Sequence, residues 1–140
     1  MRKVLLTILL SILVSIAAYA KKQNKPVIIM SSYDPTVVEA YNNTITSHNI
    51  FAVNSRIYFT IYNPKGFKSD YIKYQIIKQD DNAHIGGYTR IRNLTKKVND
   101  KYSYTDYFVL ASKGKYYIQV FDITNLHQWL AIDEFRVIDD

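Results

Sequence analysis

The chain alternates apolar and polar residues over much of its second half. The alternation is clearest over residues 55–62, where Ile57, Phe59 and Ile61 take every second position. Strict alternation of β-branched and aromatic residues predicts a strand with one face toward a core. The same pattern, or a short apolar run bounded by turn residues, predicts further strands over residues 26–32, 70–78, 88–92, 102–111, 116–122 and 129–138.

About seven short strands separated by turn residues favour an all-β fold. Hairpins with one buried and one wet face favour antiparallel pairing, so we expect a single antiparallel β-sandwich. Residues 95–100 are predicted to be a charged connection, and residues 33–49 contain positions that fit either a helical turn or an edge strand. No linker or internal repeat divides the sequence, so residues 21–140 are predicted to form one domain.

The first twenty residues have a different pattern. Arg2 and Lys3 precede an apolar run, and Ala18-Tyr19-Ala20 then has the small-x-small form of a cleavage site. The run covers about 13 residues, whereas a membrane span needs roughly 20. We therefore expect residues 1–20 to be a bacterial-type signal helix whose cleavage leaves no membrane span and a periplasmic or secreted protein. A short uncleaved anchor is the alternative.

Cysteine content and charge narrow the possible functions. The chain has no cysteine, so an exported domain of this kind depends on its core instead of disulfides and has no thiol chemistry. The net charge is +6, and loss of Arg2 and Lys3 lowers it to +4. Because the basic residues are dispersed and exported proteins rarely meet nucleic acid, we expect no nucleic-acid partner. Weak attraction to an anionic envelope polymer and an ordinary solvated surface both fit this charge.

Two stretches near the end of the chain resemble bacterial immunoglobulin-like sandwich domains. Residues 113–122 (KGKYYIQVFD) are similar to the penultimate strand of such domains, and residues 134–137 (EFRV) are similar to the final strand. The resemblance implies an immunoglobulin-like fold with a tyrosine corner, in which the Tyr116 hydroxyl bonds main chain near residues 111–113. It implies nothing specific about activity, since sandwiches carry many unrelated functions.

The residue types that perform catalysis or bind metals form no recognisable pattern. His48, His84 and His127 lie far apart in the sequence and lack ligand-type neighbours at the usual spacing. Asp80-Asp81-Asn82 lacks the alternate ligands and distal Glu of an EF-hand loop, so an Asx-rich turn and a calcium site both remain open. There is also no Gly-x-Ser-x-Gly nucleophile motif. We expect a protein that is not an enzyme and that has no cofactor and no metal.

The aromatic content is the feature that suggests binding. If alternate strand residues face the core, then Tyr58, Tyr62, Tyr71 and Tyr117 face solvent, together with Phe121. Exposed rings can pack against a protein or stack on sugars. Cross-strand pairs that only stabilise a wet sheet are the alternative.

Trp129, the only tryptophan, starts the last predicted strand beside a loop. Such a tryptophan is more often a plug in the core, and a binding residue is the alternative, because a loop at the end of a sandwich is a usual place for binding. We expect an exported, non-catalytic binding or structural module of the bacterial cell envelope. Its partner is expected to be an envelope protein, contacted through a sheet face or an edge strand. A carbohydrate-binding module that uses exposed tyrosines, with a polysaccharide as partner, is the alternative.

Overall fold

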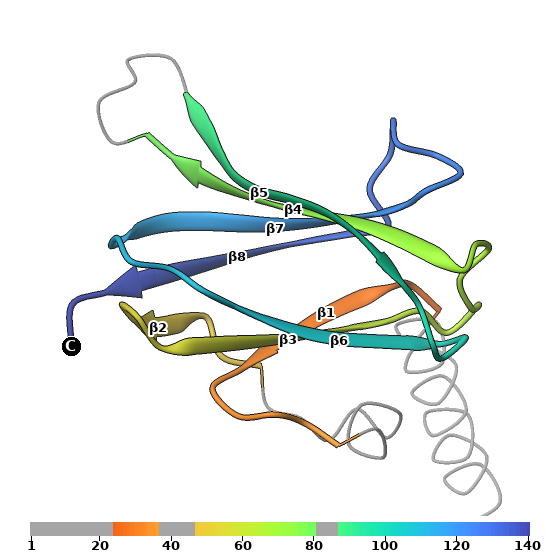
Figure 1. Cartoon of the computed structure of the whole chain (residues 1–140), viewed down its shortest axis with the longest axis horizontal. Coiled ribbons are helices and arrows are strands. Elements are labelled where there is room, and N and C mark those ends of the chain that lie inside the picture. Colours follow the sequence, from red (N-terminus) through yellow and green to blue (C-terminus); the bar gives the residue numbers. More distant parts are fainter. Residues whose placement is uncertain (1–23, 37–46, 81–86) are drawn as a thin grey trace, which may run out of the picture.

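The computed structural model describes residues 24–36, 47–80 and 87–140, and this part of the chain is all-β. Its eight strands form two sheets that face each other as the layers of a sandwich (Figure 1). The strands are β1 (Val27–Ser31), β2 (Ile50–Ala52), β3 (Arg56–Tyr62), β4 (Tyr71–Gln79), β5 (Tyr88–Lys97), β6 (Ser103–Val109), β7 (Gly114–Asp122) and β8 (Ala131–Ile138).

One sheet has the strand order β1-β3-β6, and the other has the order β2-β8-β7-β4-β5. Every pair of neighbours is antiparallel except β2 and β8, which run parallel. The prediction of a purely antiparallel sandwich is therefore wrong at this one pair. The three-residue strand β2 was not predicted, because so short a segment shows no alternation, and it is stabilised by pairing with β8.

The alternation of the sequence places the core where it was expected. Ile57, Phe59 and Ile61 are fully buried between the sheets, and the inward residues of β4 and β7 meet them from the other side. Burial of this apolar area is the main stabilising contribution to the fold. The largest fully buried side chains are Tyr74, Tyr116, Phe59, Phe108, Phe135, Met30, Ile57, Ile61, Ile72, Ile76, Ile118 and Val120.

The expected tyrosine corner is present. The Tyr116 hydroxyl donates a hydrogen bond to the carbonyl oxygen of Ser112 at 2.6 Å, inside the range predicted for its acceptor. The Tyr116 ring stacks on Phe135 of the neighbouring strand β8, with ring centroids 5.5 Å apart. This side chain therefore joins the β6–β7 connection to the core.

Several predicted strand boundaries differ from the observed ones. β6 ends at Val109 and β7 begins at Gly114, each two residues from the predicted boundary. β5 continues to Lys97, so the first half of the predicted charged connection is strand. Its charged side chains are tolerated because β5 lies at the edge of a sheet. β8 begins at Ala131, two residues after Trp129. Residues 1–20, which carry the predicted signal helix, lie outside the described residues, as do residues 37–46 of the segment that was left open. Within the described ranges, no helix has the length and hydropathy that crossing a membrane requires.

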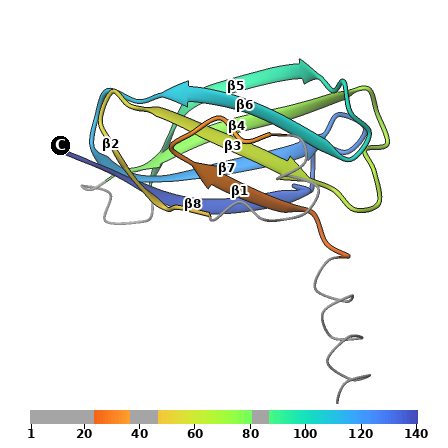
Figure 2. The same cartoon turned by 90° about the horizontal axis from the view of Figure 1, so that it is seen from below.

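The two long edges of the sandwich differ. Residues 47–52 connect both sheets on one edge, because the His48 amide donates to Met30 of β1 at 2.8 Å and the Arg136 amide of β8 donates to Asn49 at 2.7 Å. On the opposite edge lie β5 and β6, each the last strand of its sheet. Figure 2 shows β5 and β6 along one side of the molecule and β1 and β8 along the other. Main-chain hydrogen bonds therefore join the two sheets along one edge, whereas no strand pairing joins β5 to β6 along the other edge in the described part of the chain.

Candidate functional site: an unpaired edge and an end pocket

Strand β5 presents the longest unpaired edge in the described part of the chain. Nine of its ten residues pair with β4 on one side, and no described strand pairs with its other side. β5 carries four basic side chains and no acidic one: Arg90, Arg92, Lys96 and Lys97. An unpaired edge is a template for another strand, and this one has a strongly positive character.

A β-bulge interrupts β5 near its middle. Arg92 pairs with Ile76 and Arg90 pairs with Ile77, so Ile91 is the extra residue of the bulge, and its side chain is 41% exposed. Bulges and charged side chains are the devices by which edge strands avoid uncontrolled pairing. β5 thus has features that oppose indiscriminate association while its main chain stays accessible.

A polar cluster lies between the two sheets beside this edge. The Asp106 carboxylate on β6 accepts hydrogen bonds from the Tyr104 hydroxyl at 2.9 Å and from the Tyr74 hydroxyl at 3.3 Å. Lys96 of β5 lies 3.8 Å from the same carboxylate. Burial raises the pKa of Tyr74 and Tyr104 above the ordinary tyrosine value, and Asp106 raises both further, because ionised tyrosine would lie beside a negative carboxylate. The cluster therefore links β4, β5 and β6 through side chains where no main-chain bonds join the sheets.

The structure divides the predicted aromatic residues between two opposite surfaces. Tyr58 and Tyr62 lie on β3 in the three-stranded sheet, whereas Tyr71 and Tyr117 lie on β4 and β7 in the five-stranded sheet. In each sheet these residues alternate with inward core residues, so they occupy outer faces. The four tyrosines consequently form no single platform, and their roles as binding residues stay predictions.

On each outer face of the sandwich, a predicted tyrosine packs against another tyrosine ring. The Tyr58 ring packs against Tyr107 at 5.5 Å, and the Tyr117 ring packs edge-on against Tyr88 at 5.8 Å. The Tyr58–Tyr107 contact is a cross-strand pair of the kind that stabilises a sheet, whereas the Tyr117–Tyr88 contact reaches across the intervening strand β4. Phe121, expected to be exposed beside Tyr117, is only 8% exposed. Tyr88 was missed, because only the pairing of β5 with β4 and of β4 with β7 brings it next to Tyr117.

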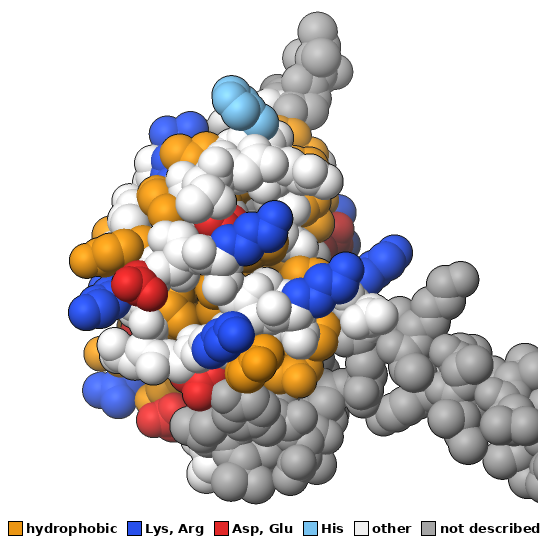
Figure 3. All heavy atoms as spheres, turned by 90° about the vertical axis from the view of Figure 1, so that its right-hand side faces the viewer, with side chains coloured by type: hydrophobic (Ala, Val, Ile, Leu, Met, Phe, Trp, Pro, Cys, Tyr) orange, Lys and Arg blue, Asp and Glu red, His pale blue; other side chains and the backbone are white. Residues whose placement is uncertain are grey.

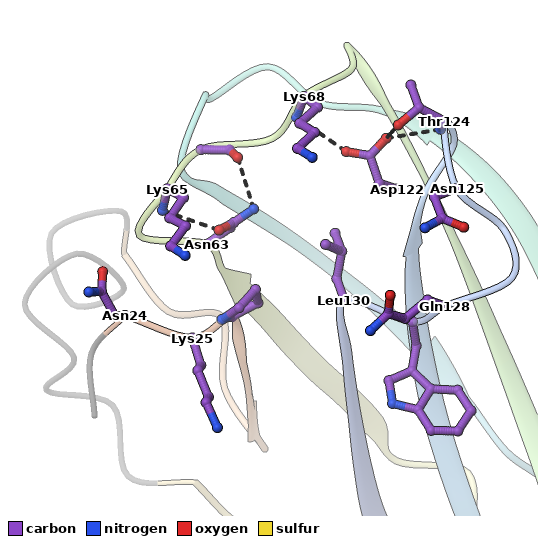
Figure 4. A pocket seen from close by; sticks show the side chains of 13 residues that line it. Asn24, Lys25, Asn63, Lys65, Lys68, Asp122, Thr124, Asn125, Gln128 and Leu130 are labelled. Carbon is purple, nitrogen blue, oxygen red and sulfur yellow. Dashed lines mark hydrogen bonds between the residues drawn. The ribbon is translucent and has the colours of Figure 1, made fainter. Parts of the chain in front are cut away.

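Trp129 lies in the β7–β8 loop with 49% of its surface exposed, so the interpretation as a core plug is wrong. It lines a pocket of about 360 Å³ at the end of the sandwich where β3 and β7 finish (Figure 4). Sequence analysis selected Trp129 but missed the rest of the lining, which comes from three segments distant in the sequence. The lining residues are Asn24, Lys25, Pro26, Asn63, Lys65, Gly66, Lys68, Asp122, Thr124, Asn125, Gln128, Trp129 and Leu130.

Side-chain hydrogen bonds hold the two loops that border this pocket. The Asn63 side-chain amide donates to the carbonyl oxygen of Gly66 at 2.9 Å and accepts from the Lys65 amide at 3.2 Å. Across the pocket, the Asp122 carboxylate accepts from the Thr124 amide and hydroxyl at 2.9 and 2.6 Å and from the Lys68 amide at 3.2 Å. Burial by itself would raise the pKa of Asp122, but these hydrogen bonds and the Lys68 charge lower it below the ordinary value. The walls of the pocket are therefore built from ordered loops.

The possible metal ligands are dispersed in the part of the chain that the structure describes. No group of three or more His, Asp or Glu side chains gathers there. At the predicted acidic turn, Asp80 accepts a hydrogen bond from the Thr89 hydroxyl at 2.9 Å. The remainder of that turn and His84 lie outside the described residues, so the calcium alternative stays open.

Comparisons with known proteins return structural likenesses only. No family model matches the chain, and no curated protein matches its sequence. Among solved structures, the chain is similar to the PmoD soluble domain from Methylocystis sp. ATCC 49242, with 15% identity and a TM-score of 0.49 over 81% of this chain and 90% of that one. It is also similar to a superoxide reductase (neelaredoxin) from Ignicoccus hospitalis, with 11% identity and a TM-score of 0.44 over 81% and 80%.

A third likeness is to the CARDB domain of a protein from Pyrococcus furiosus, with 16% identity and a TM-score of 0.39 over 84% of this chain and 97% of that one. These three likenesses are consistent with a β-rich fold for this chain. At these identities and TM-scores they carry no argument about activity, ligands or partners.

Proposed function

We propose that this chain is an exported, non-catalytic module of immunoglobulin-like type that binds an envelope protein through the unpaired edge of β5. The partner supplies an extended, acidic segment that pairs with β5 as an additional strand. The observation that carries this proposal is the ten-residue edge strand with four basic side chains, no acidic side chain and no described strand on its outer side.

Main-chain hydrogen bonds give affinity in strand addition, and side chains give selectivity. On β5, Arg90 and Lys97 pair with Ile77 and Tyr71 on the outer face of the sheet, whereas Arg92 and Lys96 pair with the buried residues of β4. Basic groups therefore flank the edge on both faces. Acidic side chains of an added strand would lie beside them, and opposite charges directly across a strand pair are favourable.

The same charges oppose pairing between two copies of this chain. If β5 paired with β5 of a second molecule, basic side chains would lie beside basic side chains, which is destabilising. The bulge at Ile91 would also be placed in both strands of such a pair. An acidic partner is consequently favoured over self-association.

The other parts of the proposal have separate support. The immunoglobulin-like type is supported by the Tyr116–Ser112 hydrogen bond and by two facing sheets. Export is supported by the pattern of residues 1–20. Sugar binding across a platform of tyrosines has less support than protein binding, because the tyrosines lie on opposite faces of the molecule.

Hydrogen exchange with synthetic ten-residue peptides tests the proposal. One peptide alternates Glu with Val, and the control peptide alternates Lys with Val. We expect the acidic peptide to slow amide exchange in β5 and to leave exchange in β2, at the opposite edge of the sheet, unchanged. The basic peptide should have no effect. Absence of protection in β5, or equal protection by both peptides, would contradict the proposal.

A charge reversal with a matched control completes the test. The double variant Arg90→Glu/Lys97→Glu should no longer bind the acidic peptide and should bind the basic peptide instead. Lys73→Glu/Arg136→Glu changes the same number of charges on β4 and β8, which lie inside the sheet, and should keep acidic-peptide binding within a few-fold of the wild type. If both variants lose the peptide equally, general charge attraction explains the binding and the role of the edge is wrong.

A further inference from the structure

We infer that the pocket at the end of the sandwich is a binding site for an anionic saccharide, in which Trp129 stacks on a sugar ring and three lysines meet its carboxylate groups. None of the lining residues belongs to β5, so this site is separate from the proposed protein-binding edge. Its volume of about 360 Å³ lies within the range of small-ligand sites, toward the lower end.

The apolar part of the pocket comes from Trp129, Leu130 and Pro26. A half-exposed indole contributes little to the core, and Trp129 has no ring partner among the described residues. Flat aromatic surface that is dry on one side and wet on the other is suited to the apolar face of a sugar ring. In Figure 4, Leu130 lies between the Asn63–Lys68 loop on one side and Asn125 and Gln128 on the other.

The electrostatic part of the pocket is positive. Lys25, Lys65 and Lys68 line it, and none of them forms an ion pair within the described part of the chain. The one acidic lining residue, Asp122, is buried, and its oxygens are occupied by Thr124 and the Lys68 amide. Figure 3 looks onto this end of the molecule, where basic, acidic and apolar side chains are interspersed. An anion at the pocket would therefore meet a net positive charge, because three lysines outnumber the single carboxylate of Asp122.

The polar part of the pocket offers unused hydrogen-bonding groups. The Asn125 oxygen accepts from the His127 amide at 3.2 Å, which leaves its side-chain NH2 group without a partner among the described residues. The Gln128 amide likewise has no partner in that part of the chain. These groups can bond sugar hydroxyls, whereas an inorganic anion could accept hydrogen bonds from the amides but would make no use of the indole. A sugar that carries carboxylates is the ligand class that matches all three parts of the lining.

The single tryptophan makes the pocket directly observable, because intrinsic tryptophan emission reports Trp129 alone. The probes are tri-galacturonic acid and a hyaluronan tetrasaccharide. The controls are the methyl ester of tri-galacturonic acid, which removes the charge, and inorganic phosphate, which removes the sugar. We expect a saturable change in emission with at least one acidic probe, weakened by added salt, at least ten-fold weaker binding of the ester, and no effect of phosphate at the same concentration.

Variants connect the signal to the lining. Lys65→Gln/Lys68→Gln should weaken binding of the acidic probe at least ten-fold, and Lys73→Gln/Lys113→Gln, which removes two lysines elsewhere, should leave it unchanged. Trp129→Ala, followed by calorimetry, should also weaken binding at least ten-fold. The inference is overturned if neither acidic probe binds, if the ester binds equally well, if phosphate reproduces the signal, or if the two lysine variants behave alike. Each outcome leaves the β5 proposal unaffected, because the peptide experiment concerns different residues.

Discussion

The hydroxyl group of Tyr116 lies 2.6 Å from the carbonyl oxygen of Ser112, four residues earlier in the chain. The Ser112 hydroxyl lies 2.9 Å from the same Tyr116 oxygen. The Tyr116 side chain is 1% exposed, and its ring lies nearly parallel to that of Phe135, at an interplanar angle of 15°. One side chain thus contributes to the core with its ring and orders the β6–β7 connection with its hydroxyl.

Tyr116→Phe should lower the free energy of unfolding by about 0.5–1.5 kcal/mol, because it removes the hydrogen bond to the carbonyl oxygen of Ser112. The ring and its stacking on Phe135 remain. Urea unfolding measures the change. The control is Tyr117→Phe on the outer face, which should change stability by less than about 0.5 kcal/mol. Equal effects of the two variants would show that the Ser112 bond contributes nothing.

Asp106→Ala should cost about 2–3 kcal/mol of stability, since it leaves the Tyr74 and Tyr104 hydroxyls without their shared acceptor inside the sandwich. Asp139→Ala is the matched control. It also removes a carboxylate with a lysine partner, but that pair is exposed and should contribute less than about 1 kcal/mol. Chemical denaturation of both variants checks the difference. A small cost for Asp106→Ala would mean that β5 and β6 do not need this cluster.

The same cluster predicts a loss of stability at high pH. Burial and Asp106 raise the pKa of Tyr74 and Tyr104 in the folded protein above the ordinary value of 10.0. Because the two tyrosines keep their protons more tightly in the folded protein than in the unfolded chain, their contribution to stability is complete below pH 10. It is lost as the pH rises above this value. Tyr74→Phe/Tyr104→Phe should therefore be less stable at neutral pH, but its stability should fall less steeply between pH 10 and 12. If the stability of the variant and of the wild type fell equally between pH 10 and 12, this link between tyrosine ionisation and stability would be contradicted.

The lowered pKa of Asp122 predicts that the protein loses stability at low pH. Hydrogen bonds from Thr124 and Lys68 lower its folded-state pKa below the ordinary value of 3.8, against the opposite effect of burial. The contribution of the Asp122 carboxylate to stability is therefore present above pH 3.8. It is lost as the pH falls through the lowered pKa of the folded protein. Asp122→Asn should cost about 1–2 kcal/mol at pH 7, and the difference from the wild type should shrink toward pH 3. A difference that is constant with pH would show that the charge is not involved.

The strands of the two sheets were largely predictable because alternation is a local property. Burying one face of a strand requires an apolar residue at every second position, as in Ile57, Phe59 and Ile61, and neighbours in the sequence carry that information. Strands at the edge of a sheet show this alternation less clearly. Residues 95–97 of β5 were predicted to be part of a connection, because strands at an edge can carry charged side chains on both faces.

Binding sites were less predictable than strands. Tyr58 and Tyr71 both have the spacing of outward residues, yet they lie on different sheets because strand order is decided by pairing between distant segments. Trp129 was noticed from its loop, but its lysine neighbours come from residues 25, 65 and 68. Only folding brings these three segments together.

The sequence alone determined which side chains point inward and where most strands lie. Both depend on residues a few positions apart, so local sterics and apolar periodicity suffice to specify them. The hydrogen bond of Tyr116 to main chain near residues 111–113 was implied by the resemblance to immunoglobulin-like domains. The tertiary structure decided that β5 is an unpaired edge, that Asp106 meets Tyr74, and that Trp129 shares a pocket with lysines from two other segments. Those relationships depend on which strands pair across long separations, and local periodicity contains no information about strand order.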